Sequence, residues 1–85
     1  LHYIEPSERW EIQLMVEMKA YESVRGTEDW TRADLWQFLE TKEGWEKTDA
    51  NQRNVSRFIK RMVDWVLMEK DHKQYRILKS DLIDV

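Results

Sequence analysis

The chain of 85 residues is long enough for one small domain, and its 41% of hydrophobic residues with only two Gly and one Pro exclude a disordered segment. It has no cysteine, which excludes disulfides and thiolate sites, and no apolar run near the roughly 20 residues that span a bilayer. The net charge of −3 argues at first sight against a nucleic-acid partner. We therefore expect a single cytoplasmic domain with no membrane partner. Because the chain begins with Leu1 and not Met, it can be part of a longer protein.

The first predicted helix covers about residues 7–25. Ser7 can cap its beginning, and Gly26 is placed to end it in a left-handed conformation. Apolar residues at helical spacing are expected to face the core: Trp10, Leu14, Met18, Tyr21 and Val24. A second apolar group lies on roughly the opposite side: Ile12, Met15 and Val16. This second group predicts either neighbours on both sides of the helix or an interface for a homodimer or another protein.

The second predicted helix covers about residues 32–43 and follows Trp30, which stands alone as an extended residue. Thr31 with Asp34 three positions later resembles a capping box. Gly44 is placed to end this helix. Its core face is predicted to contain Leu35, Phe38 and Leu39.

The third predicted helix covers about residues 50–66. One side is apolar with a clean helical period and is predicted to be buried: Val55, Phe58, Ile59, Met62, Val63 and Val66. The other side carries four cations and one acid: Arg53, Arg57, Lys60, Arg61 and Asp64. Asn54 and Ser56 flank this basic stripe on either side.

The charge of the chain is divided unevenly. Residues 1–50 hold six Lys and Arg against twelve Asp and Glu, whereas residues 51–79 hold eight against three. A basic face on an otherwise acidic protein is the electrostatic footprint of a surface that binds phosphate. The alternative is an ordinary solvated helix face, on which Lys and Arg are common.

Residues 67–78 are predicted to form a β-hairpin. Residues 67–69 and 75–78 are short strand-like segments on either side of a charged tip at 70–74. The tip has neither Gly nor Asn, so the type of turn stays open.

The segment "NVSRFIKRMVDWVLMEKDHKQYRI", residues 54–77, resembles the third helix and wing of bacterial and phage DNA-binding proteins of the winged helix-turn-helix superfamily. The segment "WTRADLWQFL", residues 30–39, resembles the start of the second helix in that family. The resemblance implies a mainly α fold with a small β-hairpin, that is, a three-helix bundle with a C-terminal wing. Two features depart from the family. The connection between Leu39 and Asn54 is long unless the third helix begins near Asp49, and Val66 stands where the family often has Gly.

The resemblance implies a DNA-binding protein without enzymatic activity, such as a small transcriptional regulator or a replication or phage accessory factor, cytoplasmic or associated with the nucleoid. The third helix would enter the major groove of double-stranded DNA and the wing would lie on the backbone. A dimer would suit a two-fold site. The alternative is a winged helix that binds another protein and no DNA, as a subunit, adaptor or inhibitor. The expected DNA-binding residues are Thr31, Arg32, Arg53, Asn54, Ser56, Arg57, Lys60, Arg61, Lys70, Lys73 and Arg76.

No catalytic motif is present. His2 and His72 are far apart and lack the spacing of metal ligands, so we expect no metal, no cofactor and no catalytic residue. The five tryptophans raise the alternative that single-stranded nucleic acid stacks on them. Packing in the core or at an interface is the favoured interpretation for most of them, and Trp45 is the one least committed to packing.

Overall fold

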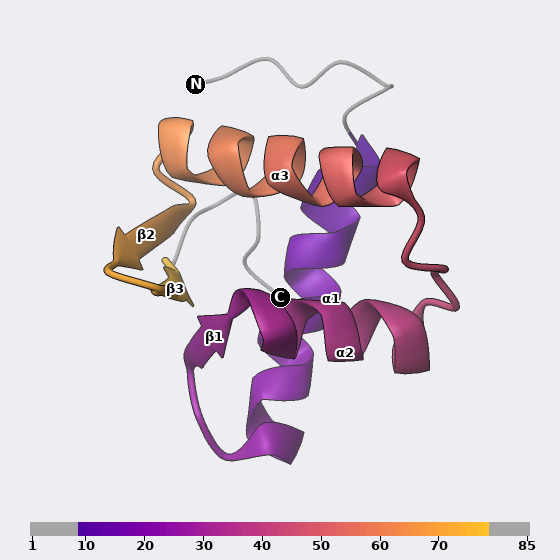
Figure 1. The fold of residues 1–85 in the computed structure, drawn as a ribbon. Helices are drawn as coiled ribbons and strands as arrows, with labels where there is room; N and C mark the ends of the chain where they lie inside the picture. Colours follow the sequence, from indigo (N-terminus) through magenta and orange to yellow (C-terminus); the bar gives the residue numbers. More distant parts are fainter. Residues whose placement is uncertain (1–8, 79–85) are drawn as a thin grey trace.

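The computed structural model describes residues 9–78, which form three helices and a small antiparallel sheet (Figure 1). This confirms the predicted class, mainly α with a small hairpin, and the arrangement is compatible with a winged helix. The predicted cap Ser7 lies outside the described residues. In chain order the elements are α1 (Arg9–Arg25), β1 (Asp29–Thr31), α2 (Arg32–Lys42), α3 (Asp49–Asp64), β2 (Met68–Asp71) and β3 (Gln74–Ile77).

All six elements contribute to one hydrophobic core. In Figure 1, α1 crosses behind the layer that α2 and α3 form, and the sheet lies beside the C-terminal end of α3. Trp30 is 1% exposed and is the largest fully buried side chain between residues 9 and 78. It contacts the Phe38 ring edge-on, with 5.7 Å between the ring centroids. The other buried apolar residues are Leu14, Met15, Met18, Leu35, Trp36, Leu39, Val55, Phe58, Ile59, Met62, Leu67, Met68 and Ile77.

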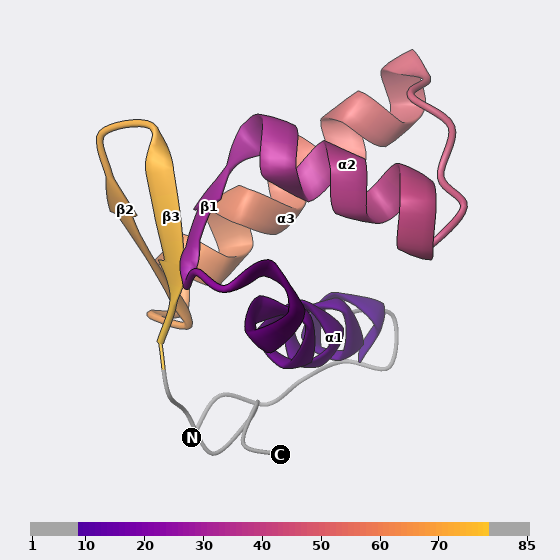
Figure 2. The same ribbon diagram turned by 90° about the horizontal axis from the view of Figure 1, so that it is seen from below.

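The sheet joins the segment before α2 to the hairpin. Its strand order is β1-β3-β2, with Trp30 opposite Tyr75 in the pair of β1 and β3 (Figure 2). The single extended residue expected before α2 is therefore a strand of three residues. In the hairpin Asp71 lies opposite Gln74, so the tip is shorter than predicted and consists of His72 and Lys73. His72 takes a positive φ of 58°, which is how the turn closes without Gly or Asn.

The helix α1 buries Leu14 and Met18 as predicted, together with residues that the sequence pattern did not assign to this face. Its buried residues are Glu11, Leu14, Met15, Met18 and Glu22, spaced at i, i+3, i+4, i+7 and i+11. Met15 is fully buried within the monomer, and Ile12 and Val16 are half-buried against the same core. Of the two predicted alternatives, neighbours on both sides of the helix is the one that holds for Met15, which is therefore not part of an exposed interface. For Ile12 and Val16 the interface stays a prediction. Two glutamates on the core face hid this stripe, because a search for apolar periodicity assigns glutamate to the surface.

The predicted outer members of the core stripe of α1 also need correction. Val24 is 72% exposed and Trp10 is 40% exposed, although the sequence pattern placed both in the core. Val24 lies in the last turn of α1 and Trp10 in its first turn, so both are at the ends of the helix.

The helix α3 begins earlier than its apolar pattern suggests. Thr48 is the N-cap, and its hydroxyl oxygen accepts a hydrogen bond of 3.1 Å from the backbone N–H of Asn51. The connection between α2 and α3 is therefore residues 43–48. This is the early start that the family resemblance requires.

The same helix ends in a Schellman motif that uses valine where glycine is usual. The N–H of Leu67 donates to the carbonyl of Met62, and the N–H of Val66 donates to the carbonyl of Val63. Val66 has a φ of 58° and is 70% exposed. The prediction that Val66 is a core residue is wrong, because the left-handed turn directs its side chain to solvent.

Candidate nucleic-acid interface

The start of α2 is held by a capping box. The Thr31 hydroxyl oxygen accepts from the backbone N–H of Asp34, and the Asp34 carboxylate accepts from the backbone N–H of Thr31, each at 3.0 Å. The capping prediction is confirmed. Half-buried Thr31 thus orders the first turn of α2, and Arg32 follows it on the surface.

Arg32 joins α2 to α3. Its guanidinium donates to the Ser56 hydroxyl at 2.8 Å and to the Gln52 carbonyl at 3.4 Å. These three residues line a shallow groove of about 410 Å³ together with Asp49 and Arg53. Arg32 and Ser56, both predicted site residues, are therefore in direct contact although 24 positions separate them.

The outer face of α3 carries three exposed cations. Arg53 and Arg57 form no ion pair with any residue between 9 and 78. Lys60 pairs with Asp64 at 3.6 Å, but their side chains are 80% and 61% exposed. An exposed pair of this kind contributes about 0.5 kcal/mol, so a phosphate can replace Asp64 as the partner of Lys60.

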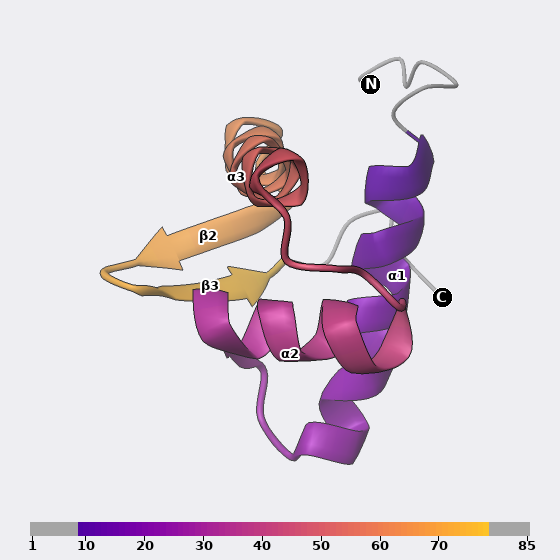
Figure 3. The ribbon, with the colours of Figure 1, turned by 45° about the vertical axis from the view of Figure 1, so that its right-hand side comes forward.

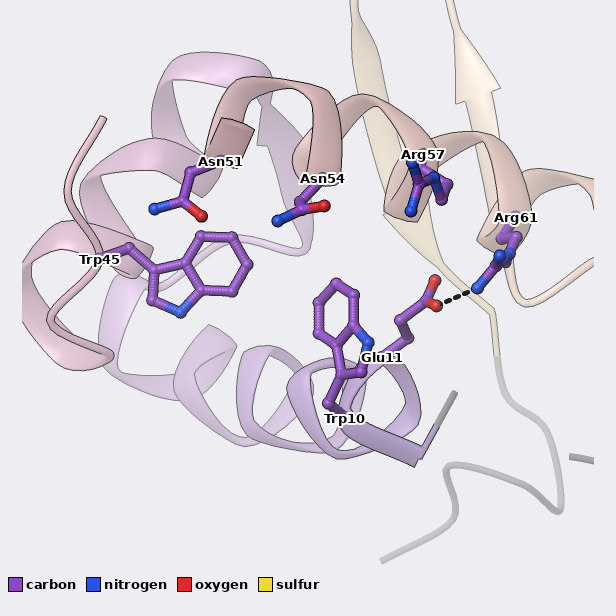
Figure 4. A pocket seen from close by; sticks show the side chains of 7 residues that line it. All are labelled: Trp10, Glu11, Trp45, Asn51, Asn54, Arg57 and Arg61. Atoms are coloured by element: carbon purple, nitrogen blue, oxygen red, sulfur yellow. Dashed lines mark hydrogen bonds and ion pairs between the residues drawn. The ribbon is translucent and has the colours of Figure 1, made fainter. Parts of the chain in front are cut away.

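Arg61 and Asn54 lie on another flank of α3, which faces α1. The guanidinium of Arg61 donates to the carboxylate of Glu11, which is fully buried on α1 (Figure 4). Asn54 is half-buried and lines a hollow beside Trp10. These two residues are separated from Ser56 by the outer ridge of the helix. The predicted site is therefore divided over three faces of α3.

The wing cations also differ in their surroundings. Arg76 donates to the Asp29 carboxylate at 2.9 Å and lies opposite Glu69 in the hairpin. The hydrogen bond that Arg76 donates to Asp29 raises the pKa of Arg76 above its ordinary value. Lys70 and Lys73 are exposed and form no ion pair with a described residue. Of the three predicted wing cations, Arg76 is the one whose charge is already compensated.

The uncompensated cations belong to elements that lie next to one another. Figure 3 shows the wing projecting on the side opposite α1, with α3 and the first turn of α2 next to it. The sequence interpretation missed Gln52 in the groove, and it missed Glu11 as the partner of Arg61. Glu11 precedes Leu14 and Met15 by three and four positions, and this helical spacing is the one signal that could have placed Glu11 in the core.

Other kinds of site find no support in the described part of the chain. Residues 9–78 contain no cluster of three or more His, Asp or Glu that could hold a metal ion. None of the helices in this range combines the length and the apolar character needed to cross a membrane.

Comparison with known proteins adds no relative. No family model matches the chain, and neither curated proteins nor solved structures give a match.

Proposed function

We propose that this chain is a winged helix-turn-helix domain that binds double-stranded DNA, as a small transcriptional regulator or a replication or phage accessory factor. One observation carries the proposal. The helix α3 carries three exposed cations, Arg53, Arg57 and Lys60, and the wing lies beside the C-terminal end of this helix. This combination of a basic helix and a basic hairpin tip fits a duplex, because a helix enters the major groove while the wing meets the adjacent backbone.

Each part of this surface has a distinct role in the proposal. Arg53 reaches base edges, where a guanidinium pairs with O6 and N7 of guanine, and Arg57, at the flank of α3, contacts a phosphate. Arg32, held by Ser56, contacts a phosphate at the start of α2. Lys70 and Lys73 contact phosphates beside the groove.

Asn54, Arg61 and Arg76 are left out of this proposal. Asn54 lines the hollow beside Trp10, away from the outer ridge of α3. Arg61 is bonded to Glu11 and Arg76 to Asp29, so binding phosphate would require breaking an existing ion pair. Arg76 therefore offers a control for the loss of one arginine. It is exposed and basic like Arg53, but it lies beside acidic Asp29 and Glu69.

The test is a titration of a labelled mixed-sequence duplex at about 50 and 200 mM salt. We expect the parent protein to bind with a steep salt dependence, and Arg53→Ala to weaken binding several-fold and reduce the salt slope by about one. Arg76→Ala should leave both affinity and slope nearly unchanged. The proposal fails if the parent does not bind at the lower salt concentration, or if the two variants behave alike.

A second candidate function is that of a module that binds a protein, which is either another protein or a second copy of the chain. It is favoured by an exposed apolar surface at the junction of α1 and α2, where Tyr21, Val24 and Phe38 line one shallow hollow. Val24 is 72% exposed there. If this surface is the functional one, Val24→Asp abolishes complex formation while Arg53→Ala does not affect it.

A further inference from the structure

A hollow of about 330 Å³ lies between α1 and α3, on the flank of α3 that is turned away from the Arg32 groove (Figure 4). Its size is at the small end of the range for ligand pockets. Its walls come from three parts of the chain: the first turn of α1, the connection before α3, and α3 itself. The lining residues are Trp10, Glu11, Trp45, Asn51, Asn54, Arg57 and Arg61.

The floor of the hollow is aromatic. The ring centroid of Trp10 is 5.9 Å from that of Trp45 and 6.1 Å from that of Phe58, which is fully buried. Trp10 is nevertheless 40% exposed, more than any other aromatic side chain between residues 9 and 78. An indole braced by two other rings and still open to solvent is a platform on which a planar group can stack.

The rim of the hollow supplies hydrogen-bonding groups. The Asn51 amide donates to the Glu46 carbonyl at 2.7 Å, which fixes the side chain and leaves its amide oxygen as an acceptor. The side-chain amide of Asn54 forms no hydrogen bond with another described residue, and Figure 4 shows both amides directed to the space above the tryptophans. An amide offers a donor and an acceptor side by side, the pattern that pairs with the edge of a nucleobase.

The charge around the hollow favours an anionic ligand. Arg57 stands at its edge without an ion-pair partner among the described residues, whereas Arg61 neutralises the buried Glu11 at the base. A planar ring with polar edges and an attached phosphate could stack on the tryptophans, form hydrogen bonds with Asn51 and Asn54, and pair its phosphate with Arg57. An acidic peptide would satisfy Arg57 alone and leave the aromatic floor unused.

We infer that this hollow receives an unpaired nucleobase of the DNA that lies along α3. The inference rests on the proposed function and deepens it. A base inside a duplex has both faces covered by its neighbours, so only a base outside the stack can lie on Trp10. Asn54 follows Arg53 by one position, which turns it about 100° around the helix, so a duplex on the outer ridge leaves the hollow open. The expected DNA ligand is therefore a duplex with an adjoining single-stranded segment.

The test uses three labelled DNAs: a blunt duplex, the same duplex with a single-stranded extension, and the single strand alone. We expect the extension to tighten binding to the parent protein about tenfold, within the range that stacking of one base supplies. Trp10→Leu and Asn54→Ala should lose this gain and bind the blunt duplex as the parent does. Trp10→Phe, which keeps a ring, should retain most of it.

The matched control is Arg53→Ala/Lys60→Ala, which should weaken binding to both duplexes equally. The inference is wrong if the extension brings no gain, or if Asn54→Ala lowers the affinity for both duplexes by the same factor. Asn54 is at the surface of α3, so this variant decides the matter even if Trp10→Leu does not fold. A third outcome is that the single strand binds, in a way that depends on Trp10, while the blunt duplex does not bind. This would overturn the proposed function and support the inference that the hollow receives an unpaired base. Binding of none of the three DNAs overturns both.

Discussion

Glu11 on α1 and Arg61 on α3 form an ion pair whose carboxylate is completely shielded from solvent. The pair connects the first helix of the fold to the third across 50 positions of sequence. It fixes the flank of α3 that borders the hollow, and it removes one of the four cations of the basic stripe from the surface available to DNA.

Removing Arg61 should destabilise the fold strongly. In Arg61→Ala the Glu11 carboxylate stays buried after losing this partner, and we expect the free energy of unfolding to fall by about 3 kcal/mol. Arg57→Ala removes the same side chain one turn earlier, from a position without an ion pair to any described residue, and should change it by less than about 0.5 kcal/mol. Urea denaturation at neutral pH measures both. Equal midpoints for the two variants would contradict a structural role for the pair.

Replacing Val66 by glycine should stabilise the protein. A β-branched residue at a φ of 58° is strained, and its exposed side chain contributes little to the core. We expect Val66→Gly to raise the free energy of unfolding by about 1 kcal/mol, after allowance for the greater freedom of glycine in the unfolded chain.

The control for this substitution is Val24→Gly. Val24 is exposed to the same extent but lies within α1, so glycine there should lower the free energy of unfolding by about 0.5 kcal/mol. Thermal denaturation of both variants gives the two signs. A loss of stability in both would show that Val66 is not strained.

The stability of the protein should fall as pH rises from about 4.5 to about 7. A hydrogen bond between the carboxyl groups of Glu43 and Glu17, partial burial and the charge of Glu17 raise the pKa of Glu43 from 4.5 to about 7. Between these values the folded state binds more protons than the unfolded state, so the free energy of unfolding decreases with increasing pH. Because Glu43 is exposed, we expect an effect of less than about 1 kcal/mol.

Glu43→Gln should remove this part of the pH dependence, since its amide can donate to Glu17 at any pH. The variant is expected to be more stable than the parent at pH 8 and similar to it at pH 4.5. Glu40→Gln, which removes a carboxylate from α2 without affecting the pair, should keep the slope of the parent. Urea midpoints measured across this pH range distinguish the two variants.

Glu22 should tolerate glutamine better than leucine. It is 6% exposed, accepts a hydrogen bond of 3.0 Å from the indole N–H of Trp30, and pairs with Lys19 at 3.0 Å. Leucine leaves the buried indole N–H without an acceptor, at a cost of about 2 kcal/mol, whereas the amide oxygen of glutamine keeps one. Thermal melts should rank the parent above Glu22→Gln, and Glu22→Gln above Glu22→Leu. Equal stability of the two variants would show that the hydrogen bond to Trp30 contributes nothing.

Features that depend on neighbours in the sequence were predictable. The apolar period from Val55 to Met62 identified the buried side of α3, and the pair Thr31 and Asp34 identified the start of α2. Both are local, because a helical period and a capping box involve residues within a few turns of each other. The wing was predicted in the same way, although its tip was predicted to be longer than it is.

The errors arose where distant residues decide the outcome. The core face of α1 was predicted only in part because Glu11 and Glu22 are buried there, and each has a partner from another part of the chain, Arg61 or Trp30. Val66 was placed in the core because its position continues the period of α3, whereas the backbone has already turned at Trp65.

The sequence by itself determined the order of helices and strands, the buried side of α3 and the concentration of positive charge in residues 51–79. Only the tertiary structure decided which of those charges are available to a partner. Arg61 and Arg76 are compensated by Glu11 and Asp29, which lie 50 and 47 positions away, while Arg53 and Arg57 stay unpaired among the described residues. The physical reason is that an ion pair depends on the distance between two charges in space, and periodicity along one helix contains no information about that distance.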